Sequence, residues 1–163
     1  MPSFDIVSKV DMQLLDNAVN VVHKELSNRY DFKGTAVNIE LKKKEMVISL
    51  EVETDMKMHQ AEEVLLSRAM RQGIDPQALD MTKEAGQSGK LLKKEIPVKN
   101  GISREDAKKL MNVIKGSGLK VQTQMMDDTL RVSGKKIDDL QAVIQLCKTN
   151  NLGIPLQFSN MKS

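Results

Sequence analysis

The sequence predicts an α+β protein that contains two copies of one small module. Two patterns predict this class: short segments alternate apolar and polar residues, as half-buried strands do, and longer segments repeat apolar residues at helical spacing. The order strand, helix, strand, strand, helix occurs twice along the 163 residues. Since 40% of the residues are hydrophobic, the chain can bury two small cores.

The first set of elements occupies the first half of the chain. A short strand is predicted at 4–8, and apolar residues at every third or fourth position predict a helix over 12–26. Alternating residues then predict a hairpin whose strands lie at 37–41 and 46–52, joined by a charged turn. A second apolar stripe predicts a helix over 58–69, which ends before a glycine.

The second set of elements follows a polar segment. Residues 82–90 have almost no apolar content and include two glycines, so they are predicted to form an exposed linker. The elements then return in the same order, as a strand at 92–98, a helix over 107–114, strands at 119–125 and 129–133, a helix over 137–147 and a last strand at 156–158. Duplication of one module is the economical explanation.

A strand-helix-strand-strand-helix-strand unit predicts a ferredoxin-like module. In this arrangement two helices cover one face of a four-stranded antiparallel sheet, and the other face stays open to a ligand. Because the two copies share similar edges, we expect their N-terminal strands to be exchanged. The first module then comprises residues 10–98, and the second comprises residues 1–9 plus 99–163.

Charge is distributed unevenly, although the net charge is only +3. Residues 1–88 contain 11 Lys/Arg and 15 Asp/Glu, a net charge of −4, whereas residues 89–163 contain 14 and 7, a net charge of +7. This asymmetry indicates a polyanionic partner for the second half. The alternative is a solvated surface that happens to be rich in lysine.

The composition also predicts a soluble, cytoplasmic protein. No apolar run approaches the roughly 20 residues of a membrane-spanning helix. The N-terminal segment lacks the basic start and apolar stretch of a secretory signal. Cys147 is the single cysteine, so it cannot form an internal disulfide, and this fits a reducing compartment.

The hairpin of the second module offers polar side chains to a ligand. Gln122 and Gln124 share one face of a strand, as Arg131 and Ser133 do in its partner strand, and they could contact phosphates and base edges. An ordinary solvated face would have the same pattern. The hairpin strands of both modules lack aromatic residues, so the stacking platform of RNA-recognition modules is missing. Glutamates on the first hairpin would repel phosphates.

A turn of small residues and lysines at 133–136 precedes the last helix. The free N–H groups of a helix start favour anions, although a simple helix-start turn is the competing interpretation. The sequence has no glycine-rich Walker pattern, no dinucleotide fingerprint and no convincing catalytic set. His23 and His59 have no neighbouring ligand residues at metal-binding spacing, so no metal site is predicted.

Four motifs in the same order resemble the bacterial YajQ family over essentially the whole chain. They are Pro-Ser-Phe-Asp-Ile-Val-Ser at 2–8, Arg-Tyr-Asp-Phe-Lys-Gly at 29–34, Gly-Lys-Lys-Ile-Asp-Asp-Leu-Gln-Ala-Val-Ile at 134–144 and Pro-Leu-Gln-Phe at 155–158. The resemblance implies two ferredoxin-like modules with exchanged N-terminal strands. It also implies a nucleotide-binding protein without enzymatic activity, and no cofactor is predicted. Some members resemble cyclic di-GMP receptors that act with a transcription regulator, and others are linked to transfer or ribosomal RNA.

The family offers no single binding motif to carry over, so the candidate ligand contacts follow from side-chain chemistry. They are Arg29, Phe32, Lys33, Lys90, Lys93, Lys94, Arg131, Lys135 and Lys136. Arginine can hold a phosphate through two hydrogen bonds, and Phe32 could stack on a base, although a core position for Phe32 is the competing interpretation. The leading hypothesis is a non-enzymatic nucleotide binder, in particular a cyclic di-GMP receptor. The alternatives are an RNA-binding accessory protein and a protein-interaction adaptor without a nucleotide ligand.

Overall fold

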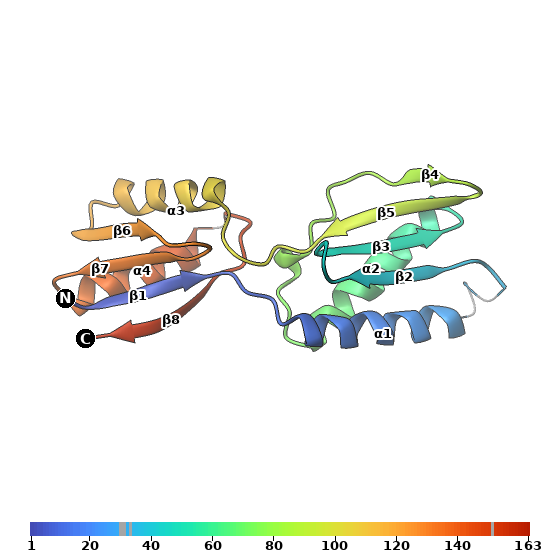
Figure 1. Cartoon of the computed structure of the whole chain (residues 1–163), viewed down its shortest axis with the longest axis horizontal. Coiled ribbons are helices and arrows are strands. Elements are labelled where there is room, and N and C mark those ends of the chain that lie inside the picture. Colours follow the sequence, from blue (N-terminus) through green and yellow to red (C-terminus); the bar gives the residue numbers. More distant parts are fainter. Residues whose placement is uncertain (30–31, 33, 151) are drawn as a thin grey trace. The chain divides into compact units, whose positions relative to one another are not determined.

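The chain forms two compact units, each built on a four-stranded antiparallel sheet (Figure 1). The computed structural model describes residues 1–29, 32, 34–150 and 152–163. Met1–Lys9 and Asn100–Ser163 form one unit, which we call the terminal unit, and Val10–Lys99 form the other, the middle unit. With two helices in each unit, the predicted α+β class is confirmed.

The middle unit contains sheet B, in the strand order β2-β3-β5-β4. Its elements are α1 (Met12–Asn28), β2 (Asn38–Lys42), β3 (Val47–Val52), α2 (Asp55–Arg71), a 3-10 turn at Pro76–Ala78, β4 (Gly86–Ser88) and β5 (Leu91–Pro97). Asp11 begins α1, because its carboxylate accepts hydrogen bonds from the backbone N–H groups of Gln13 and Leu14 at 3.0 and 3.2 Å.

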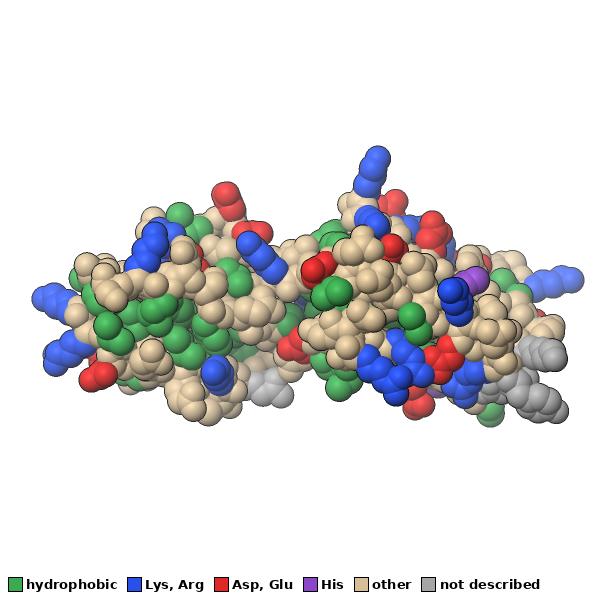
Figure 2. Space-filling view, turned by 90° about the horizontal axis from the view of Figure 1, so that it is seen from below, with side chains coloured by type: hydrophobic (Ala, Val, Ile, Leu, Met, Phe, Trp, Pro, Cys, Tyr) green, Lys and Arg blue, Asp and Glu red, His purple; other side chains and the backbone are tan. Residues whose placement is uncertain are grey.

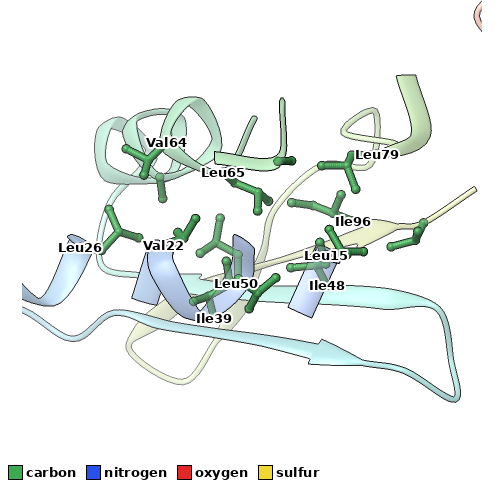
Figure 3. Packing of buried hydrophobic residues seen from close by; sticks show 14 of the residues in the cluster. Leu15, Val22, Leu26, Ile39, Ile48, Leu50, Val64, Leu65, Leu79 and Ile96 are labelled. Carbon is green, nitrogen blue, oxygen red and sulfur yellow. The ribbon is translucent and has the colours of Figure 1, made fainter. Parts of the chain in front are cut away.

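One face of sheet B is covered by both helices of the middle unit. Figure 3 shows the apolar side chains of this core, with residues of α1 and α2 packed over Ile39, Ile48, Leu50 and Ile96. Ile48, Leu50 and Ile96 are fully buried. The apolar periodicity of the sequence therefore corresponds to a real core, and the opposite face of sheet B has no helix of this unit on it.

The segment predicted to be an exposed linker at 82–90 needs a correction. Its side chains are mostly exposed, but Gly86–Ser88 form strand β4, which pairs antiparallel with β5. The prediction used the absence of apolar side chains as its criterion. A strand at the edge of a sheet is held by backbone hydrogen bonds to its neighbour, so it needs few apolar side chains.

The terminal unit contains sheet A, in the strand order β6-β7-β1-β8. Its elements are β1 (Ser3–Val7), α3 (Arg104–Gly116), β6 (Val121–Met125), β7 (Leu130–Gly134), α4 (Ile137–Thr149) and β8 (Gln157–Lys162). Phe4, Ile6, Leu130 and Val132 lie on the face that α3 and α4 cover. We call the opposite face of sheet A its open face.

The strand that precedes the first helix of each unit belongs to the sheet of the other unit. β1 precedes α1 in the chain but pairs with β7 and β8, and β5 precedes α3 but pairs with β3 and β4. An exchange of first strands between two copies of a module would produce this pairing. The exchange itself stays a prediction. The observed pairing means that β1 completes sheet A from outside the segment Asn100–Ser163, whereas all four strands of sheet B come from Val10–Lys99.

None of the helices in the described parts of the chain combines the length and the apolar character that crossing a lipid bilayer requires.

Candidate functional site

A pocket of about 720 Å³ opens at the end of sheet A where β6 begins and β7 ends. Lys120, Lys135 and Lys136 line it, and Asp139 is the one carboxylate among its described lining residues. The remaining lining consists of Met1, Gly118, Leu119, Val121, Gln122, Ser133 and Gly134. Three ammonium groups against one carboxylate favour an anionic ligand.

The pocket lies where several elements of the terminal unit begin or end. β1 and β6 begin and β7 ends at the left end of this unit in Figure 1, and Figure 2 shows Lys and Arg side chains at the same end. Gly118, with φ of 74°, turns the chain from α3 toward β6. The short loop therefore brings Lys120 to the start of β6, beside the end of β7.

Gly134 lets β7 approach β6 closely at the floor of the pocket. A Cβ atom at this position would lie 3.1 Å from Cγ1 of Val121 and 3.3 Å from the carbonyl oxygen of Lys120. Beyond Gly134 the chain leaves the sheet, and the two lysines that follow enter the start of α4. This close approach gathers all three lysines at one end of the sheet.

The start of α4 contributes the second source of positive potential. Asp11, Thr54 and Ser103 cap α1, α2 and α3 through side-chain hydrogen bonds, whereas Lys136 at the start of α4 makes no such bond. The first N–H groups of a helix carry the positive end of its dipole and can bind an anion. Acidic residues in the first turn of α4 offset part of this potential.

The open face of sheet A adjoins the pocket and carries polar side chains. Gln122 lies opposite Ser133, and Gln124 lies opposite Arg131, so all four share the face as the sequence indicated. Arg131 is not available as an isolated cation, because its Nε donates to Oδ1 of Asp5 at 3.0 Å. This bond holds the pKa of the Asp5 carboxyl below its ordinary value.

Asp5 is a polar partner that sequence reasoning missed. It lies directly opposite Arg131 in the pairing of β1 with β7, and Asn160 donates a second hydrogen bond to its Oδ2 at 3.1 Å. Asn160 has φ of 61° and lies at the register irregularity between β1 and β8. The sequence placed residues 1–9 in the same module as Arg131, but it did not predict the register of β1 with β7, which sets Asp5 opposite Arg131.

Phe32, one of the candidate contacts, does not offer its ring to a base. The side chain of Phe32 is only 1% exposed and belongs to the core of the middle unit. The guanidinium carbon of Arg29 lies 6.0 Å from its ring centroid, close enough for a cation–π contact. The stacking interpretation is therefore replaced by the core interpretation, and Lys33 lies outside the described residues.

The three lysines near β5 have different environments. Lys90 is exposed in the β4–β5 turn, and Lys93 lies opposite Glu51 on the face of sheet B that the helices leave open. Lys94 lies opposite Leu50, on the helix-covered face. It is 9% exposed, and its Nζ lies 2.7 Å from Oε1 of Glu62 in α2. The alternation of a strand forces this difference, because neighbouring residues point to opposite faces.

Two of the nine candidate contacts, Lys135 and Lys136, line the pocket. Lys120 joins them, although the sequence analysis did not single it out. The hairpin register pairs Val121 with Gly134, which places Lys120 beside Lys135. The turn at 126–129 sets this register. Counting back along both strands from that turn would have placed Lys120 next to Lys135.

The fold and the pocket define a class of protein with two ferredoxin-like modules and a pocket lined by three lysines. A family model described as "Nucleotide-binding protein YajQ-like" matches residues 2–162. The chain therefore belongs to the YajQ family, as the motifs in its sequence indicated.

Curated relatives match the chain over its whole length. A "Nucleotide-binding protein" of Cytophaga hutchinsonii is 52% identical over 162 residues, which cover 99% of this chain and 100% of the relative. Proteins of the same description from Syntrophotalea carbinolica and Oleidesulfovibrio alaskensis are 50% and 49% identical, and each alignment covers 100% of both chains.

Proposed function

We propose that the protein binds a nucleotide whose phosphate groups lie in the pocket at the start of α4. The observation that carries this proposal is the convergence of Lys120, Lys135 and Lys136 around a helix start without a side-chain cap. Lysines neutralise phosphate charge, and the N–H groups of the helix donate hydrogen bonds to phosphate oxygens. The descriptions of the family model and of the relatives support the same ligand class.

The pocket dimensions favour a small ligand over a long polymer. A volume of about 720 Å³ lies in the range of small-molecule sites, about 300–1,000 Å³. Cyclic di-GMP is the first ligand to test, and in this proposal the loaded protein acts with a transcription regulator. The role is binding without catalysis, because the lining consists mainly of groups that hold a phosphate rather than attack it.

RNA binding is the second candidate function. It is favoured by the polar open face of sheet A, which continues from the pocket through Gln122 and Ser133 to Gln124. Against it, the carboxylate of Asp5 lies on the same face and would repel a phosphate backbone. We therefore rank a small nucleotide first.

Calorimetric titration distinguishes these ligands. The purified protein is titrated with cyclic di-GMP and with a short single-stranded RNA, each at low and near-physiological salt. A dinucleotide that carries two phosphates should lose little affinity as salt rises, whereas RNA that contacts several phosphates should lose affinity steeply. Saturable dinucleotide binding with a shallow salt dependence is the expected result.

Variants assign the ligand to the pocket. The double substitution Lys135→Gln and Lys136→Gln should weaken binding by about 100-fold or more, since each of the two charged hydrogen bonds contributes about 1.5–3 kcal/mol. Lys90→Gln, in the middle unit, is the matched control and should leave the affinity unchanged. Equal losses in both variants would place the ligand elsewhere, and no binding of either ligand would favour the adaptor hypothesis.

A further inference from the structure

The edge strands of the two described sheets differ in how well they are protected from pairing with another chain. The edges are β2, β4, β6 and β8. β2 carries Glu40 and Lys42, β4 has only three residues, and β8 has an irregular register with Asn160 at positive φ. Charges, shortness and bulges are the usual devices that block an edge.

Strand β6 has none of these devices along Val121–Met125. It contains no charged residue and no proline, and its register with β7 is continuous over all five residues. Figure 1 shows β6 at the edge of sheet A, beside α3. An uncharged, regular edge strand of this kind is a ready template for an added strand.

The hairpin fixes which backbone groups of β6 point to the free edge. The N–H of Met126 donates to the carbonyl of Thr129 at 2.9 Å, so these two residues form a hydrogen-bonded pair. Bonded and non-bonded pairs alternate along an antiparallel ladder. Gln122 and Gln124 therefore bond to β7, and the N–H and C=O groups of Thr123 and Met125 point away from β7.

A groove of about 650 Å³ runs between α3 and this edge. Its apolar lining is Met111, Ile114, Leu119 and Val121, and its polar lining includes Lys108, Asn112, Lys115, Gln122 and Thr123. Two lysines and no carboxylate occur among the described lining residues. The groove therefore combines apolar contact area with positive charge along a strand that can accept a partner.

We propose that β6 and this groove bind an extended segment of a partner protein, which adds to sheet A as a fifth strand. Apolar side chains of the segment pack against Met111, Ile114 and Val121, and its acidic side chains lie near Lys108 and Lys115. Charge complementarity selects an acidic partner. A second copy of this chain is a poorer occupant, because the terminal unit itself carries 11 Lys/Arg against 7 Asp/Glu.

The test uses NMR hydrogen exchange on the whole protein and a short synthetic peptide, Glu-Thr-Val-Thr-Val-Thr-Glu, in which the valines and the two terminal glutamates share one face of a strand. We expect saturable binding, and we expect the amide protons of Thr123 and Met125 to exchange at least about 10-fold more slowly in the complex, because they enter a ladder. A peptide with lysine in place of glutamate is the matched control and should not bind. Equal binding of both peptides, or protection on β8 instead of β6, would overturn the proposal.

Two variants separate strand addition from unspecific attraction. Thr123→Pro removes an N–H that β7 does not use, so the sheet should persist while peptide affinity falls by about 10-fold. If this variant does not fold, the double substitution Lys108→Glu and Lys115→Glu tests the same proposal by reversing the charge of the groove, and peptide affinity should again fall. Lys109→Glu, on the exposed side of α3, is the control. Unchanged affinity in the double charge variant would contradict the proposal. Concentration-dependent protection of Thr123 without peptide would also overturn it, since a second copy would then be the occupant.

Discussion

The ammonium group of Lys94 lies 2.7 Å from the Oε1 atom of Glu62 on the helix-covered face of sheet B. Both side chains are largely buried, with 11% and 13% of their surface exposed. Leu50, the residue opposite Lys94, is fully buried. The positive charge of this lysine, in the middle of an otherwise apolar strand face, is thus balanced by one carboxylate from α2.

Substituting one partner of this ion pair should destabilise the protein more than substituting both partners by apolar residues. Glu62→Gln leaves the ammonium group buried without a countercharge, so the free energy of unfolding should fall by about 3 kcal/mol. The double substitution Glu62→Leu and Lys94→Met should cost less than the single one, because no charge stays buried. Urea unfolding measures both values. Lys93→Met, on the opposite face, is the control, and a loss in the control equal to that of Glu62→Gln would contradict the prediction.

Phe32 should contribute to stability and not to ligand binding. Truncation by Phe32→Ala should lower the free energy of unfolding by about 3–5 kcal/mol, as for other buried phenylalanines. Phe32→Leu keeps an apolar side chain and should leave nucleotide affinity unchanged. Loss of a stacked base would instead weaken binding by about 1–3 kcal/mol, and calorimetry on this variant would reveal it.

The Asp5–Arg131 pair should make the stability of the protein depend on acid pH. The hydrogen bond from Arg131 holds the pKa of the Asp5 carboxyl below 3.8, its value in an unfolded chain. The carboxylate therefore stabilises the fold above about pH 4, and this contribution is lost as the pH falls through the lower folded pKa.

Urea unfolding between about pH 5 and pH 2 measures this effect. The free energy of unfolding should fall less steeply with decreasing pH for Asp5→Asn than for the parent protein. Asp127→Asn, in the exposed β6–β7 turn, should keep the parent's slope, and identical slopes for Asp5→Asn and the parent would refute the role of the pair.

Removing residues 1–9 should unfold the terminal unit and spare the middle unit. β1 is an inner strand of sheet A, paired with β7 on one side and β8 on the other, and it supplies the buried side chains of Phe4 and Ile6. Hydrogen exchange on the truncated chain should show lost protection at Val132 and retained protection at Ile48. Retained protection at Val132 would show that sheet A does not need β1.

The elements that could be predicted from sequence are those with strong periodicity. The four helices and the β2–β3 and β6–β7 hairpins could be predicted because their apolar side chains recur at the spacing needed to face a core. The duplicated order could be predicted because the same series of elements occurs twice. β4 could not be predicted, since Gly86, Gln87 and Ser88 are held by backbone bonds to β5 and carry no apolar pattern. Of the residues that line the candidate site, Lys135 and Lys136 stood out in the sequence beside a helix start, whereas Lys120 reaches the pocket through strand register.

The sequence by itself determined the α+β class, the two cores and the family, because periodicity and motifs are local properties of the chain. Only the tertiary structure decided which charged side chains are accessible. Lys93 and Lys94 are neighbours in sequence, yet one lies on the open face of sheet B and the other is paired with Glu62 beneath the helices. The physical reason is that burial depends on which elements cover each face of a sheet, and those elements come from distant parts of the chain.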